Sequence, residues 1–119
     1  MKGNIILSSS LIDADEFSNF QYDDIHLSVV QSNNFLPADI VLILINLVEN
    51  VGYNATYDLV KQCVLQVYSI ISHKKHKPAS FHLKLSYNGN EISCDINTSL
   101  TDDQRDKLID AVAQKILSL

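Results

Sequence analysis

The sequence predicts a single α+β domain in which helices pack on one face of a mainly antiparallel sheet. Three observations predict this class: some stretches alternate like strands, others repeat at helical spacing, and turn or cap signals separate them. With 119 residues, 46% of them hydrophobic and 19% charged, the chain has the size and composition of one globular domain spanning 1–119. The predicted order of elements is β-β-α-α-β-β-α.

Two strands are expected near the start of the chain. Residues 4–11 hold three consecutive apolar residues before three serines, and residues 25–31 alternate apolar and polar side chains. Residues 12–24, between them, carry five carboxylates and three aromatic rings. We expect a loop or one short helical turn there.

The longest apolar run, from Leu36 to Val48, is interpreted as a buried helix. Pro37 and Asp39 suit the first turn of a helix, and no turn signal follows until Gly52. The β-branched residues of the run favour a strand instead, so both alternatives stay open.

A second helix is predicted over residues 57–71, where apolar residues recur at spacings of three and four. The basic segment 73–78 should end it, because cations near the last carbonyls complement the helix dipole and Pro78 cannot continue the helix. A third helix should follow Thr101, which forms a capping box with Gln104. Apolar residues then recur on one face of that helix through Ile116.

A β-hairpin is predicted around Asn88-Gly89, the preferred sequence of a two-residue type I′ turn. Apolar and polar residues alternate on both sides of it. A three-residue loop would set apolar side chains opposite polar ones, so the pattern selects the tight turn. The tight turn forms three apolar pairs: Leu85 with Ile92, Leu83 with Cys94, and Phe81 with Ile96.

The net charge of −5 is unevenly distributed, with eight acids and one lysine through Asp58, then eight bases and six acids. This acidic balance argues against nucleic acid as a partner, because phosphates require a basic surface. Cys63 and Cys94 are far apart and are expected to be free thiols of a cytoplasmic protein. The chain shows neither a secretory signal core nor the roughly 20 apolar residues of a membrane span, so no membrane partner is expected.

No cofactor, metal or catalytic residue is predicted. His73 and His76 lack companion ligands, and three glycines in all leave no phosphate-binding loop. His82 and Asp95 should face each other on the polar side of the hairpin, where a carboxylate could orient an imidazole as a general base. Such pairs also occur between strands without function, and no nucleophile accompanies this one in an obvious motif.

The acidic and aromatic segment is the candidate partner-binding surface. Carboxylates attract a basic partner, and aromatic rings commonly anchor interfaces. The alternative is an acidic loop whose aromatic rings pack into the core. The candidate residues are Asp13, Asp15, Glu16, Phe17, Phe20, Tyr22, Asp23 and Asp24.

Three functions are compatible with this sequence. The first is a small acidic protein-binding module, such as an immunity protein that neutralises a basic toxic nuclease, which needs only a stable scaffold and a complementary surface. The second is a structural or adaptor module that self-associates as a homodimer through apolar surface or a sheet edge. The third is a small enzyme built on His82, Ser93 and Asp95.

Overall fold

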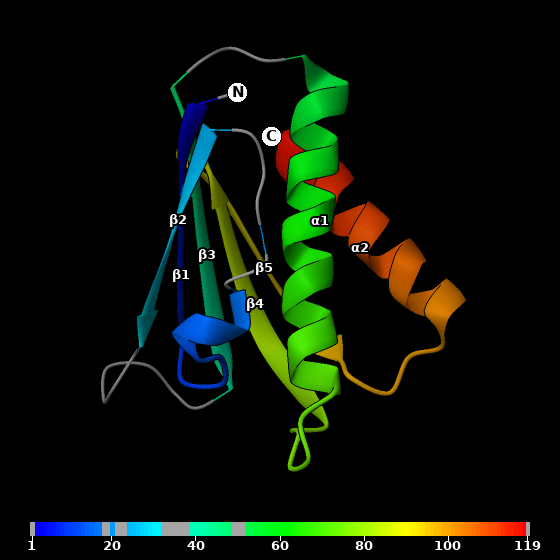
Figure 1. The fold of residues 1–119 in the computed structure, drawn as a ribbon. Helices are drawn as coiled ribbons and strands as arrows, with labels where there is room; N and C mark the ends of the chain where they lie inside the picture. Colours follow the sequence, from blue (N-terminus) through cyan, green and yellow to red (C-terminus); the bar gives the residue numbers. More distant parts are fainter. Residues whose placement is uncertain (1, 18–19, 21–23, 32–38, 49–51, 119) are drawn as a thin grey trace.

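The computed structural model describes residues 2–17, 20, 24–31, 39–48 and 52–118. A five-stranded sheet in the order β2-β1-β3-β4-β5 carries both long helices on one side (Figure 1). The α+β class and the single layer of helices on one sheet face are therefore confirmed. The elements are β1 (Lys2–Ser9), the 3₁₀ helix η1 (Ala14–Phe17), β2 (Asp24–Gln31), β3 (Ile40–Leu47), α1 (Tyr53–Ser72), β4 (Ser80–Tyr87), β5 (Asn90–Asn97) and α2 (Asp102–Leu117).

The sheet is mixed, which corrects the expectation of a mainly antiparallel one. β1 pairs with β2 in parallel and β3 pairs with β4 in parallel, whereas the β1–β3 and β4–β5 pairs are antiparallel. The connections explain this arrangement. The chain crosses back over the sheet through α1 between β3 and β4, and a crossover of that length joins strands that run in the same direction.

The long apolar run forms strand β3, so the helix interpretation is wrong and the strand alternative is right. β3 lies in the middle of the sheet, between β1 and β4. Val41, Ile43 and Ile45 are buried beneath the helices, and the residues between them are apolar as well. A central strand with two apolar faces has no alternation to distinguish it from a buried helix. Asp39 lies in the turn before β3, and residues 36–38 fall outside the described residues.

The predicted hairpin is confirmed in its turn and in its register. Asn88 and Gly89 both have positive φ angles, 46° and 92°, as a type I′ turn requires. All three predicted apolar pairs across β4 and β5 are formed.

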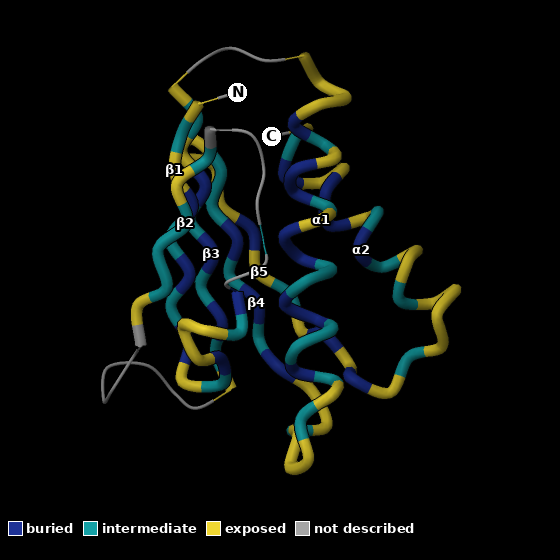
Figure 2. The backbone as a smooth tube through the Cα atoms, viewed as in Figure 1, coloured by how far each residue is buried: buried dark blue, intermediate teal, exposed yellow. Residues whose placement is uncertain are grey.

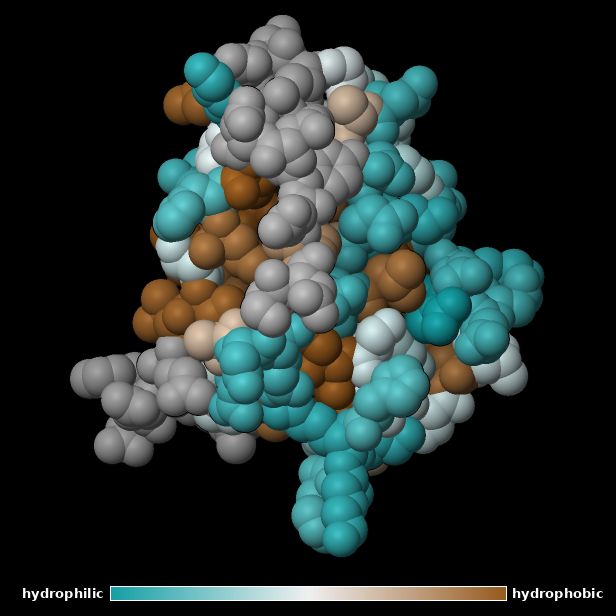
Figure 3. All heavy atoms as spheres, in the orientation of Figure 1, coloured by the Kyte–Doolittle hydropathy of each residue, from teal (hydrophilic) through white to brown (hydrophobic). Residues whose placement is uncertain are grey.

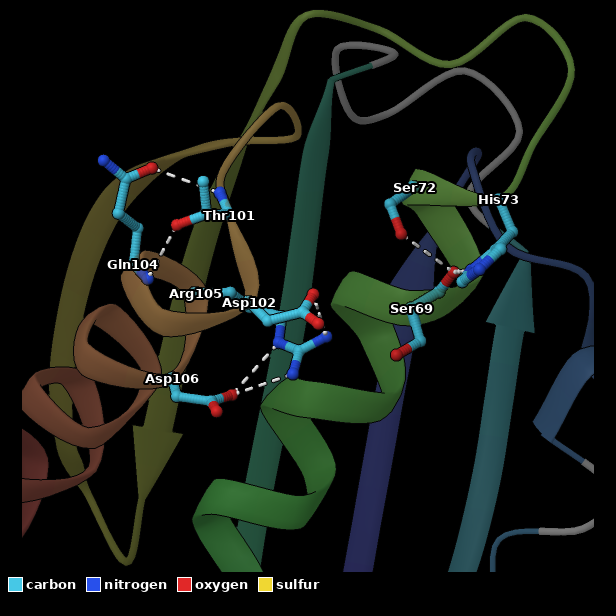
Figure 4. A network of polar contacts seen from close by, with 8 residues as sticks. All are labelled: Ser69, Ser72, His73, Thr101, Asp102, Gln104, Arg105 and Asp106. Carbon is cyan, nitrogen blue, oxygen red and sulfur yellow. Dashed lines mark hydrogen bonds and ion pairs between the residues drawn. The ribbon is translucent and has the colours of Figure 1, made fainter.

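The two later helices are also confirmed. α1 contains the predicted apolar stripe and begins at Tyr53, four residues earlier than expected. At the start of α2, the Thr101 hydroxyl accepts from the Gln104 backbone N–H at 3.2 Å, and the Gln104 side chain accepts from the Thr101 N–H at 3.1 Å. Figure 4 shows this capping box beside the end of α1, where the His73 ring lies 2.6 Å from the Ser69 carbonyl.

The core lies between the sheet and the helices, where the buried segments face one another (Figure 2). Phe17 and Phe81 are among its largest side chains. α2 packs against α1 and contacts β4 and β5. Neither of these helices is long and apolar enough to cross a membrane.

Candidate functional site

The acidic segment is tied to the rest of the protein by an ion pair that sequence reasoning did not predict. Glu16 on η1 accepts a hydrogen bond from Lys74 Nζ at 2.8 Å and another from the Asp13 backbone N–H at 2.7 Å. Burial alone would raise the pKa of Glu16, but these two bonds outweigh burial and the pKa is lowered. The Glu16–Lys74 ion pair holds η1 against the loop that follows α1, so the Glu16 carboxylate makes a contact within the protein.

The two described aromatic rings of this segment, Phe17 and Phe20, turn inward. The Phe17 side chain belongs to the core and is only 2% exposed, which withdraws it from the candidate partner-binding set. Phe20 is half-buried and packs edge-to-face on Phe17, with ring centroids 5.9 Å apart. The alternative that the rings pack into the core is therefore confirmed for these two residues.

Five of the eight candidate side chains fall within the described residues, and two of these five are exposed. Asp13 and Asp15 are exposed carboxylates on and beside η1. Tyr22, Asp23 and the side chain of Asp24 lie outside the described residues. Within the described part of this segment, the exposed side chains of the candidate set are these two carboxylates, and no aromatic ring there is fully exposed.

A second surface lies on the opposite side of the sheet, and we call it the open sheet face. It consists of the strand residues that point away from α1 and α2, and neither of these helices covers it (Figure 1). Strand registers place its residues side by side. Ile6 of β1 stands opposite Leu44 of β3, and Leu42 stands opposite Lys84 of β4.

The centre of the open sheet face is apolar. Four residues there are half-buried, and we call them the apolar strip: Ile6, Ile40, Leu42 and Leu44. Three of the four come from β3. The interpretation of the apolar run that forms β3 as a helix did not predict this surface. The β-branched residues of the run were the signal that could have revealed the strip.

Charged and polar side chains border the apolar strip on its β4 and β5 side. A shallow hollow of about 230 Å³ lies there, lined by Leu42, Leu44, Lys84, Ser86 and Glu91 together with Ile43. Lys84 and Glu91 form no ion pair with any residue that the structure describes. Both charges are therefore available to a bound partner.

The predicted pair of His82 and Asp95 is present on the open sheet face. The two residues stand opposite each other in the hairpin, with His82 Nδ1 and Asp95 Oδ1 2.7 Å apart. Their side chains are 32% and 80% exposed, and neither lines the hollow beside Lys84. Ser93 stands opposite Lys84 in the register. The Asp95 carboxylate can orient the His82 imidazole.

The two thiols are free, as predicted, and neither is activated. Burial raises the pKa of Cys63 to about 12. Burial also raises the pKa of the half-buried Cys94, and the neighbouring Asp95 carboxylate adds to that rise. Both thiols are therefore protonated at neutral pH and poor nucleophiles. No cluster of three or more His, Cys, Asp or Glu side chains arranged for a metal ion occurs in the described ranges.

Comparison with known proteins adds no relative: no protein-family model, curated protein or solved structure matches this chain.

Proposed function

We propose that the chain is a small protein-binding module that docks a basic protein on its open sheet face, as an immunity protein docks the nuclease it inhibits. The observation that carries the proposal is the apolar strip at the centre of a sheet face that neither α1 nor α2 covers, bordered by Lys84 and Glu91, which form no ion pair with any described residue. A fully desolvated apolar centre inside a polar rim is the usual anatomy of a protein interface.

The apolar strip supplies the affinity in this proposal. Completing the burial of one leucine side chain contributes at most about 1.5–3 kcal/mol, and half-buried residues such as Leu42 and Leu44 contribute less each. Four such residues together offset a substantial part of the several kcal/mol that association costs in lost freedom. In the described part of the acidic segment, the exposed candidates are the carboxylates of Asp13 and Asp15, which bury no comparable apolar area, so the open sheet face is the better candidate.

The net charge supplies the choice of partner. A chain of net charge −5 attracts a basic protein over a distance and repels an acidic one. At short range, Glu91 and Lys84 fix the orientation of the partner, since charges at an interface rim act mainly on specificity and association rate. An inhibitor needs no catalytic group, because covering the partner's cleft is sufficient.

The experiment compares partner capture by the wild-type chain with capture by two matched variants from a lysate of the cells that produce it. Leu44→Ser removes an apolar side chain from the strip, whereas Val48→Ser removes one that is 80% exposed at the end of β3. We expect wild type and Val48→Ser to capture the same basic protein. Leu44→Ser should bind that protein about tenfold more weakly, although the circular dichroism spectrum of the variant is unchanged.

A charge variant tests the electrostatic part separately. Glu91→Lys should slow association at low salt, and the difference from wild type should shrink at high salt, whereas the loss in Leu44→Ser should persist at high salt. Asp103→Lys on α2 is the matched control, because Asp103 is an exposed carboxylate of the helical layer. Equal binding by the Leu44→Ser and Val48→Ser variants, or capture of acidic proteins, would contradict the proposal.

A further inference from the structure

We propose that strand β2 pairs antiparallel with the β2 strand of a second copy of this chain, which gives a symmetric dimer with one continuous sheet. The inference goes beyond the proposed function, because it uses a sheet edge and a different occupant. It rests on the position of β2, on the composition of its edge, and on the register that the strand can form with itself.

β2 is the outermost strand on one side of the sheet, and β1 is the one described strand that pairs with it. An edge strand of eight residues offers a row of backbone N–H and C=O groups for a further strand, and proteins usually protect such edges with charges or proline. The one acid of β2 is Asp24, its first residue, and residues 25–30 contain no lysine, acid or proline, with His26 as their one ionisable residue. The opposite edge strand, β5, carries Glu91 and Asp95. Charged residues thus protect the interior of β5, whereas residues 25–30 of β2 contain no lysine or acid.

The apolar side chains of β2 are also incompletely covered. Ile25, Leu27 and Val29 are only half-buried, although Ile5 and Leu7 beside them on β1 are fully buried. Figure 3 shows hydrophobic surface gathered along the β2 edge of the sheet. On the open sheet face, Val30 is 50% exposed. A neighbouring strand at this edge would cover these side chains.

A second copy of the chain can pair its own β2 with this edge strand, and the result is a closed dimer. In the register centred on Leu27, Ile25 stands opposite Val29 of the partner copy and Leu27 opposite its own counterpart, so apolar side chains meet on the helical side. His26 stands opposite Ser28, so no like charges oppose each other. The two outer edges of the combined sheet are then both β5, whose carboxylates discourage further growth. The symmetry is therefore that of a closed two-fold dimer rather than a fibre.

The first test is the mass of the chain in solution, measured by light scattering after size-exclusion chromatography. The chain has a mass of 13.3 kDa, and we expect twice that mass at high concentration. Ser28→Lys places a charge on the β2 edge and should weaken dimerisation at least about tenfold. Ser93→Lys makes the same change on β5 and should leave the dimer intact. A monomeric mass at about 1 mM, or equal weakening by both variants, would overturn the proposal.

The second test uses the unmodified chain, so it does not depend on any variant folding. Amide hydrogen exchange is measured at concentrations above and below the dimerisation midpoint. Protection of residues 25–30 should rise with concentration, while protection of β5 stays constant. Concentration-dependent protection on β3 or β4 instead would overturn the proposal and locate the contact on the open sheet face. Protection of β2 only after another protein is added would also overturn it, because the occupant would be a different strand.

Discussion

The type I′ turn of the hairpin gives the sharpest stability prediction, which concerns Gly89→Val. Gly89 has φ +92°, and a Cβ atom built on it meets no other atom within 4 Å. The added Cβ therefore meets no other part of the fold, and the cost that we expect comes from forcing a β-branched residue into positive φ. That cost is about 1–2 kcal/mol, and valine lies at the upper end because branching at Cβ restricts the backbone further.

Urea unfolding followed by circular dichroism measures this cost. The unfolding midpoint should fall while the slope stays the same, since the surface exposed on unfolding does not change. A loss of 1–2 kcal/mol corresponds to a roughly 5–30-fold increase in the unfolded fraction. Gly89→Asn is the matched control, because asparagine tolerates positive φ far better than valine does. If both variants unfold at the same urea concentration as wild type, a positive φ at this position is not required and the turn assignment is wrong.

Three further predictions concern the N-terminal cap of α2, an ion pair and a thiol. Thr101→Ala should lower the free energy of unfolding by about 1 kcal/mol, because the Gln104 N–H loses its cap, and urea unfolding measures that loss. Glu16→Gln should destabilise the protein at neutral pH by less than about 1 kcal/mol. The folded-state pKa of Glu16 is lowered, so its stabilising effect is present above the unfolded-state pKa and disappears as pH falls through the folded-state pKa. The urea unfolding curves of wild type and Glu16→Gln should therefore converge in acid. A difference in stability that stays constant with pH would contradict this. Iodoacetamide at pH 8 should leave Cys63 unmodified in the native protein and alkylate it in urea, which mass spectrometry detects; rapid native alkylation would show the thiol to be accessible.

The parts of the fold that could be predicted from sequence are those in which local chemistry determines the structure. Asn88-Gly89 fixes the hairpin because few other residues adopt two consecutive positive φ angles, and alternation then sets the register. The cap at Thr101 fixes the start of α2 by satisfying exposed N–H groups. Neither prediction needed information about distant parts of the chain.

The parts that could not be predicted depend on tertiary neighbours. β3 is apolar on both faces because it lies between β1 and β4, and that position is invisible in its own sequence. The parallel pairs of the sheet follow from which strands become neighbours after each crossover. The Glu16–Lys74 ion pair joins residues 58 positions apart. The candidate site shifted from the acidic segment to the open sheet face for the same reason, since both surfaces are created by packing.

The most direct test of the open sheet face is a methyl NMR titration of the isotope-labelled chain with the basic partner that the capture experiment is expected to identify. The account predicts that the methyl signals of Ile6, Leu42 and Leu44 shift or broaden, while those of the buried Leu59 stay in place. Unchanged signals from the apolar strip, together with shifts confined to residues 12–17, would contradict it and return the binding surface to the acidic segment.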